Sequence, residues 1–186
     1  MPGLNKNFVV LSQSDNAAID SVLKNMQDAW ASGNGIAYAS LFFEDATYVE
    51  APGLRVSGNQ MIGERHQKIF DTIFKYSRID GKYYSEIQPL TNDVVLIHLE
   101  GNVFFPGEKS TEKIKPNGLV TICLLKRNDV WKIISFQNTP TGKFRGLKFM
   151  ARFLFSRIYM FSAEWKKAEK YMLAEKQMNM EHWRQP

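Results

Sequence analysis

The 186-residue sequence has little of what most metal-binding and cofactor-binding motifs require. It contains one cysteine and three histidines, and no two histidines have ligand spacing, which argues against a zinc or iron site. It has no GxGxxG, GxSxG or HExxH motif and no phosphate-binding glycine loop, so nucleotide cofactors and serine-hydrolase chemistry have no support. We therefore expect neither a metal nor a cofactor.

The single cysteine and the lack of long apolar runs indicate the cellular compartment of the protein. Cys123 cannot form an internal disulfide, and it lies in an apolar stretch where a thiol is usually a packing residue. Residues 1–14 are expected to be a leader segment before the domain, and their apolar run is too short for a secretory signal. No stretch is long enough to span a bilayer. These features predict a cytoplasmic protein.

Charge is divided unevenly along the chain, whose net charge is +5. Residues 1–142 contain 14 Lys and Arg against 15 Asp and Glu, whereas residues 143–186 contain 10 against 4. The nearly neutral body argues against nucleic-acid binding, and we expect any electrostatic partner to meet the basic tail.

Long β-strands are predicted in the second half of the chain. Residues 117–139 contain two apolar, β-branched runs around a polar turn at 126–129, which predicts one long antiparallel hairpin. Two further strands are predicted before it, at 78–88 and 94–105.

Helices are predicted mainly in the first half. Ser14 or Asp15 can cap the first helix. Its apolar stripe consists of Ile19, Val22, Leu23, Met26 and Trp30. A short second helix over residues 36–43 and a strand over 46–50 follow, and then a short strand at 55–57.

A third helix is predicted to begin at Gly58. Its apolar face is formed by Ile62, His66, Ile69, Phe70 and Ile73. An imidazole in an apolar stripe needs a hydrogen-bond partner, which a ligand, Glu50 or a backbone carbonyl could supply. Helices followed by long strands predict an α+β domain with the helices on one face of a curved antiparallel sheet.

Three features of residues 15–140 resemble a known superfamily. The first is Gly33-Asn34 with Leu41-Phe42 and Glu44-Asp45-Ala46 ahead of the first strand. The second is Gly58 at the start of a helix that contains His66 and Phe70. The third is the closing motif Trp131-x-Ile133-x-x-Phe136-x-Asn138-Thr139. Together they resemble the nuclear-transport-factor-like (SnoaL-like) superfamily of cone-shaped domains, and most of all its SgcJ/EcaC-type family. The resemblance implies a homodimer through the outer sheet face and a deep apolar pocket between sheet and helices.

A second resemblance, to ketosteroid isomerases of the same fold, concerns Glu50. Residues 45–50 are similar to the stretch that ends in their catalytic aspartate, and Glu50 falls in that slot. The next residue is Ala51 rather than proline, and Met26 and Val120 stand where oxyanion donors would be. The resemblance therefore implies a base without the matching oxyanion hole.

Two residues are candidate catalytic groups, Glu50 and His66. An apolar cavity makes a carboxylate more basic, which suits a general base near neutral pH, whereas a solvated strand-end glutamate is the alternative for Glu50. His66 either lines the pocket or is a hydrogen-bonded core residue. The candidate ligand-binding residues are Tyr48, Phe70, Phe136 and Asn138. Asn138 either holds a ligand oxygen or ties the strand end to the helices, and His98 faces either the pocket or the dimer interface.

The expected function is binding of a small apolar or polyketide-like molecule, with isomerase-type or cyclase-type proton transfer if the protein is an enzyme. The alternative is a non-enzymatic ligand carrier or a dimerisation module. Residues 141–186 are predicted to be a basic, amphipathic helical extension. The wide apolar arc and narrow cationic face of residues 143–161 suit docking on the domain or its dimer partner, or binding to an anionic membrane surface.

Overall fold

A computed structural model of the protein describes residues 9–51, 53–80, 86–104 and 118–140. The predictions for the extension 141–186, including docking or membrane-surface binding by residues 143–161, concern residues outside these ranges. Within the described ranges, no helix is long and apolar enough to cross a membrane.

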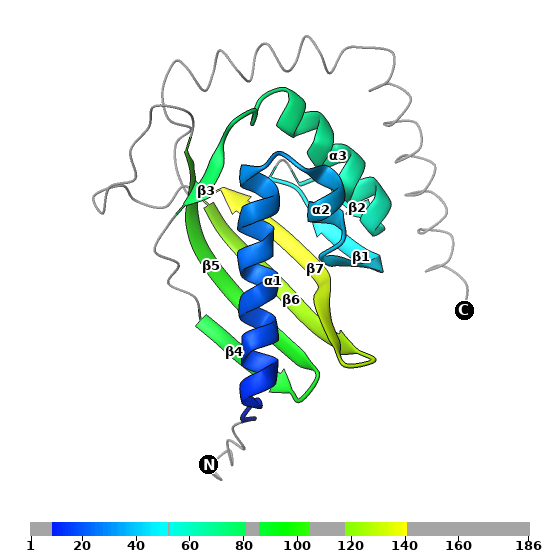
Figure 1. The fold of residues 1–186 in the computed structure, drawn as a ribbon, viewed down its shortest axis with the longest axis vertical. Coiled ribbons are helices and arrows are strands. Elements are labelled where there is room, and N and C mark those ends of the chain that lie inside the picture. Colours follow the sequence, from blue (N-terminus) through cyan, green and yellow to red (C-terminus); the bar gives the residue numbers. More distant parts are fainter. Residues whose placement is uncertain (1–8, 52, 81–85, 105–117, 141–186) are drawn as a thin grey trace. The chain divides into compact units, whose positions relative to one another are not determined.

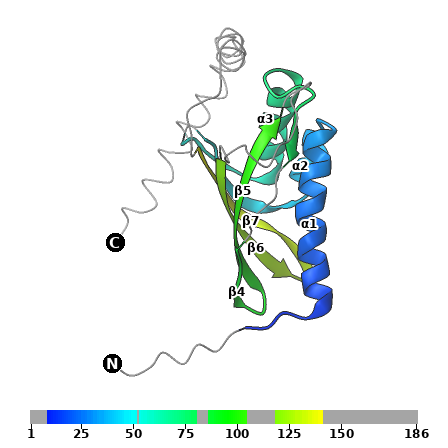
Figure 2. The same cartoon turned by 90° about the vertical axis from the view of Figure 1, so that its left-hand side faces the viewer.

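In the described part of the chain, three helices lie on one face of a curved, open sheet (Figures 1 and 2). The helices are α1 (Gln13–Ala31), α2 (Gly35–Ala39) and α3 (Asn59–Asp71). The strands are β1 (Phe42–Val49), β2 (Arg55–Ser57), β3 (Arg78–Asp80), β4 (Glu86–Thr91), β5 (Val94–Phe104), β6 (Gly118–Arg127) and β7 (Val130–Pro140). The order is β2-β1-β7-β6-β5-β3, and β4 also pairs with β5. Among the described strands, β1 and β7 are the one parallel pair. The predicted α+β class is confirmed.

The predicted long hairpin consists of β6 and β7. Its loop residues Asn128 and Asp129 both have left-handed backbones, with φ of 50° and 61°. A two-residue loop with two positive φ angles matches the twist of paired strands, and asparagine and aspartate tolerate it better than most residues. The turn chemistry thus fixes the hairpin register from Arg127 opposite Val130 onward.

An extra residue interrupts this register in β7. Ile134 has no partner in β6, because the pairing shifts between Cys123 and Leu124. The bulge changes which residues face the helices: Ile133 is buried, and the next buried position is Phe136. The three-residue spacing of Ile133 and Phe136 therefore places both side chains on the inner face.

Helix α1 covers the sheet with its apolar stripe. Its buried residues are Ile19, Val22, Met26, Ala29 and Trp30. The predicted cap was wrong: the N-cap is Ser12, whose Oγ accepts a hydrogen bond from the backbone N–H of Asp15 at 3.0 Å. Ser14 and Asp15 lie inside the first turn, and the carboxylate of Asp15 binds elsewhere.

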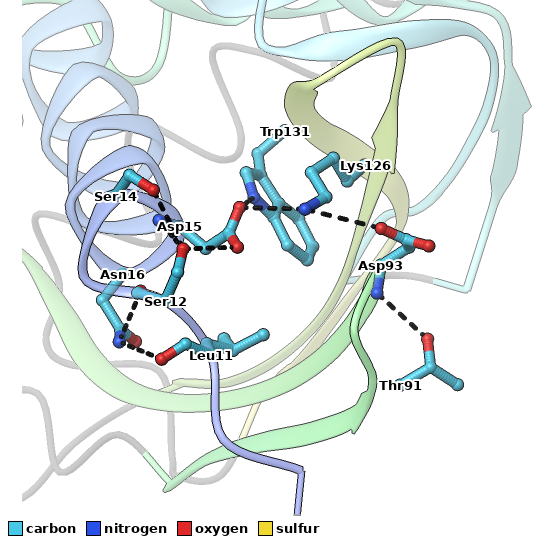
Figure 3. Close-up of polar contacts among 9 residues, drawn as sticks. All are labelled: Leu11, Ser12, Ser14, Asp15, Asn16, Thr91, Asp93, Lys126 and Trp131. Atoms are coloured by element: carbon cyan, nitrogen blue, oxygen red, sulfur yellow. Dashed lines mark hydrogen bonds and ion pairs between the residues drawn. The ribbon is translucent and has the colours of Figure 1, made fainter.

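Asp15 ties the start of α1 to the β6–β7 hairpin (Figure 3). Its Oδ1 accepts hydrogen bonds from Nε1 of Trp131 at 2.7 Å and Nζ of Lys126 at 3.1 Å. Its Oδ2 accepts one from Oγ of Ser12 at 2.7 Å. The bonds from Trp131, Ser12 and Lys126 lower the pKa of Asp15 to about 2. The carboxylate of Asp15 is therefore negatively charged near neutral pH.

Helix α2 is shorter than predicted, and β1 is longer. The helix was expected over residues 36–43 but ends at Ala39. The chain leaves the helix because Leu41 and Phe42 already belong with β7: the backbone N–H of Ile133 donates to the carbonyl of Leu41 at 2.9 Å, and Phe42 lies opposite Ile133. This long-range pairing takes precedence over the local helical tendency.

The single strand predicted over 78–88 is observed as two strands, β3 and β4. Both pair with β5, so that Arg78 lies opposite Phe104 and Ile87 lies opposite Ile97. Pro89 lies within β4, which pairs only with β5 among the described strands. A proline is tolerated in such an edge strand, because its missing N–H breaks no central ladder.

Two glycines bring α2 and α3 into close contact. A Cβ on Gly63 would lie 2.7 Å from the Cβ of Ala39, and a Cβ on Gly35 would lie 2.5 Å from the carbonyl oxygen of Gly63. Real Cβ atoms do not approach so closely, so only glycine fits at either position without a shift. This packing places Tyr38 of α2 against His66 of α3.

Candidate functional site

Three polar aromatic side chains meet beneath the helices, and we call them the polar cluster: Tyr38 of α2, Tyr48 of β1 and His66 of α3. Each is at most 6% exposed. The Tyr38 ring stacks on the His66 ring with 4.1 Å between centroids, and the Tyr48 ring meets His66 edge-on at 5.0 Å. Three elements of the first half of the chain thus bring three hydrogen-bonding side chains together in the core.

The hydrogen bond of His66 defines its tautomer. Nδ1 lies 2.7 Å from the backbone carbonyl oxygen of Ile62, which can only accept, so Nδ1 carries the proton. Burial lowers the pKa of His66 to about 4, with a smaller contribution from the positive charge of Arg65, so the ring is neutral near pH 7. Nε2 is then an acceptor, and it makes no hydrogen bond within the described part of the chain.

The two tyrosine side chains lie close enough to influence each other electrostatically. Burial raises the pKa of Tyr48 well above its ordinary value, and Tyr38 and the charge of Glu50 add to the effect. Tyr48 therefore stays protonated, and it can donate a hydrogen bond but cannot serve as a base near neutral pH.

Apolar rings surround the polar cluster. Phe136 stacks on Tyr48 with 4.5 Å between centroids, and Phe70 lies 5.8 Å from the His66 ring. Trp30 meets His66 edge-on at 6.2 Å. The candidate ligand-binding residues Phe70 and Phe136 are thus both buried beside Tyr48 and His66.

Glu50 lies at the end of β1 and is ion-paired with Arg65 of α3. Nη2 of Arg65 donates to one carboxylate oxygen at 2.8 Å, and Nε donates to the other. A tight turn positions the glutamate, because its backbone N–H donates to Leu54 and its carbonyl accepts from Gly53. The two side chains are 21% and 14% exposed. Glu50 is therefore a partly buried carboxylate with both oxygens occupied.

Two further candidates lie outside the polar cluster. Asn138 is half-buried on the inner face of β7, with its Oδ1 beside Gly118, and no contact described here joins it to His66. His98 lies between the buried residues Ile97 and Leu99, so it points to the opposite, outer face of the sheet. Of the two alternatives for His98, this position favours the interface side.

Sequence reasoning missed Tyr38 and Arg65. Tyr38 lies in a five-residue helix, which is too short to show an apolar period. Arg65 is adjacent to His66, but nothing in the local pattern indicates a partner in Glu50, 15 residues away. Both assignments require the tertiary structure.

A cavity of about 330 Å³ lies apart from these residues. It is lined by Phe42, Phe43, Glu44, Asp45, Asn59, Arg127 and Lys132. Arg127 there donates to both carboxylate oxygens of Asp45, at 2.8 and 2.9 Å, and covers the ring of Phe43. None of the predicted site residues lines it. Across the described ranges, no three His, Cys, Asp or Glu side chains form a group that could hold a metal ion.

No protein-family model matches the sequence, and no curated protein matches it. Solved structures do resemble it. A domain of unknown function with a cystatin-like fold from Nostoc punctiforme is 24% identical, with a TM-score of 0.63, covering 90% of this chain and 99% of that one. An NTF2-like protein of unknown function from Shewanella oneidensis is 19% identical, with a TM-score of 0.53 and coverages of 67% and 98%.

A candidate scytalone dehydratase from Novosphingobium aromaticivorans is also similar, at 14% identity and a TM-score of 0.57, with coverages of 72% and 91%. Identities this low establish the fold and not the activity. The assignment to the SgcJ/EcaC-type family stays a prediction. The chain has the cystatin-like α+β fold of NTF2-like proteins, which confirms the fold that the resemblance to the nuclear-transport-factor-like superfamily predicted.

Proposed function

We propose that the protein binds a small apolar molecule between the sheet and the helices, with the polar cluster at one end of the site. One observation carries the proposal: Nε2 of His66 is buried among aromatic rings without a hydrogen-bond partner in the described chain. A buried polar atom left unpaired costs about 1–3 kcal/mol. A ligand that supplies the missing bond recovers this free energy.

The same cluster suits proton-transfer chemistry of the isomerase, dehydratase or cyclase type on a polyketide-like molecule. The imidazole of His66 is neutral near pH 7 and can accept a proton at Nε2, and the burial that lowers its pKa to about 4 makes it a weak base. The hydroxyls of Tyr38 and Tyr48 can donate to an oxygen that gains negative charge. Tyrosine donors would take the place of the oxyanion groups that Met26 and Val120 lack. Two solved structures with this fold carry dehydratase names, which supports the reaction class. No step requires a cofactor.

A non-enzymatic carrier is the second candidate. It is favoured by the ion pair, because both oxygens of Glu50 accept hydrogen bonds from Arg65. A carboxylate held in this way is poorly placed to remove a proton from a ligand. In the carrier, Glu50 and Arg65 would only hold α3 against the end of β1.

Deuterium exchange into the ketone 2-tetralone distinguishes the two candidates. The protein is mixed with 2-tetralone in D₂O, and loss of the protons next to the carbonyl is followed by ¹H NMR. If the protein is an enzyme, deuterium exchange should be faster with the wild type than with Glu50→Gln or His66→Phe. The outer-face control Gln137→Ala should match the wild type. Binding without faster exchange supports the carrier. If 2-tetralone and the apolar probes used below all fail to bind at the cluster, the proposed function is wrong.

We also infer a homodimer formed through the outer face of the sheet. That face carries half-buried apolar side chains at Leu96, Leu119, Cys123 and Leu125. Two identical apolar patches can pair across a two-fold axis. Sedimentation velocity tests this inference: the wild type should be a dimer, Leu125→Glu should shift it toward monomer, and Lys24→Glu on exposed α1 should not. A monomeric wild type at all concentrations would contradict it.

A further inference from the structure

We infer that the ligand of the polar cluster presents a hydroxyl group, and that Nε2 of His66 accepts its hydrogen. This inference rests on the proposed function and adds the chemical class of the ligand. It also assigns His66 as the residue that selects hydroxyl-bearing ligands over their ethers and ketones.

The geometry around His66 determines the direction of this hydrogen bond. The carbonyl of Ile62 accepts from Nδ1 at 2.7 Å, so the imidazole proton is already used. Nε2 then has a lone pair and no proton. A ligand carbonyl or ether also has only lone pairs, so neither can bond to Nε2. A ligand hydroxyl can.

The carboxylate of Glu50, which is the charged acceptor near the cluster, already has a partner. Both of its oxygens accept from Arg65. Nε2 of His66, in contrast, has no hydrogen-bond partner among the described residues and can accept one from a ligand.

The surroundings of Nε2 suit a planar apolar molecule. The rings of Trp30, Phe70 and Phe136 supply aromatic surface beside the polar cluster. His66 is 4% exposed, so a ligand reaches Nε2 by displacing part of this aromatic packing. A phenol or an enol on an aromatic body fits these requirements.

Three probes with one naphthalene body test the inference: 2-naphthol, 2-methoxynaphthalene and 2-acetonaphthone. The first has a hydroxyl, the second an ether and the third a carbonyl. Their dissociation constants are measured by calorimetry for the wild type and for His66→Phe, which keeps an aromatic ring against Tyr38. In the wild type, 2-naphthol should bind about tenfold more tightly than either of the others. In His66→Phe, this preference should disappear.

A second variant and a spectroscopic signal separate recognition from folding. His66→Gln places a carbonyl oxygen near the position of Nε2, so it should retain part of the preference for 2-naphthol even if His66→Phe does not fold. In the wild type, the ¹⁵N resonance of Nε2 should shift on addition of 2-naphthol and not of 2-methoxynaphthalene. Circular dichroism checks that each variant is folded.

Four results would overturn the inference. Equal affinities for 2-naphthol and 2-methoxynaphthalene at the cluster, or a preference for 2-acetonaphthone, would refute the hydroxyl and leave the proposed pocket standing. An ordered water bound to Nε2 in every complex would make His66 a structural residue only. If no probe perturbs the NMR signals of the cluster, the proposed function fails, and this inference fails with it.

Discussion

Tyr48 and Phe136 stack face to face across the parallel strands β1 and β7, with 4.5 Å between ring centroids and 7° between ring planes. They are direct partners in the strand register. Phe136 reaches this position because the bulge at Ile134 turns it toward the helices. One inserted residue in β7 thus completes the aromatic wall beside His66.

Replacing Phe136 with alanine should lower the free energy of unfolding by about 3–5 kcal/mol, because it removes a fully buried ring and leaves a cavity beside Tyr48. Urea denaturation measures the loss. The neighbouring residue Gln137 is exposed on the outer face, so Gln137→Ala should change stability by less than about 0.5 kcal/mol. Similar losses for the two variants would show that the stack contributes little.

Stability should depend on pH through His66. Its pKa is about 4 in the folded protein, below the ordinary 6.5, so the unfolded chain binds the proton more readily and protonation favours unfolding. The stability is fully present above pH 6.5 and should fall by roughly 3 kcal/mol as the pH drops from 6.5 to 4. Urea titrations at a series of pH values measure this slope.

His66→Phe is the matched test of that slope, since phenylalanine keeps the ring and removes the titrating group. The difference in stability between wild type and variant should change steadily between pH 6.5 and 4 and be constant above pH 7. A difference that does not vary with pH would mean that His66 is not buried as described.

Asp15→Asn should destabilise the protein at neutral pH, because it removes the charge that binds Lys126 and the start of α1. The pKa of Asp15 is lowered to about 2, so its contribution is present above about pH 3.8 and is lost as the pH falls toward 2. The gap in Tm between wild type and Asp15→Asn should therefore close over this range. Asp20→Asn, exposed on the same helix, should show no comparable gap.

Gly63→Ala should cost about 1–3 kcal/mol through overpacking between α2 and α3, although alanine is the better helix former. The new Cβ would lie 2.7 Å from the Cβ of Ala39. Adding Ala39→Gly removes that clash, so a double-mutant cycle should show a favourable coupling between the two positions. Part of the loss should remain, because the new Cβ would still lie 2.9 Å from the carbonyl oxygen of Gly35. Additive effects would indicate that the contact with Ala39 does not contribute to the cost.

The fold was predictable where local chemistry and tertiary structure agree. The Asn128-Asp129 turn, the stripe of α1 and the position of His66 in the apolar face of α3 could all be read from spacing and residue type. The boundaries that failed depend on distant partners. Ser12 caps α1 while Asp15 binds Trp131, 116 residues away, and the chain leaves α2 early because it pairs with β7.

Part of the candidate site could also be predicted from the sequence, and part could not. Tyr48, His66 and Phe136 were named because an apolar stripe and a resemblance point to them. Tyr38 was missed, because it meets His66 only through the close approach of two glycine-containing helices. The pairing of Glu50 with Arg65 was missed because charge partners across elements leave no periodic signal in a sequence.

A crystal structure of the protein with 2-naphthol tests the central claim most directly. The account predicts the naphthol oxygen within hydrogen-bond distance of Nε2 of His66, the proton of Nδ1 still directed at Ile62, and the naphthalene body against Tyr48 and Phe136. Naphthol density only in the cavity beside Arg127, or none beside His66 while the aromatic packing is unchanged, would contradict it.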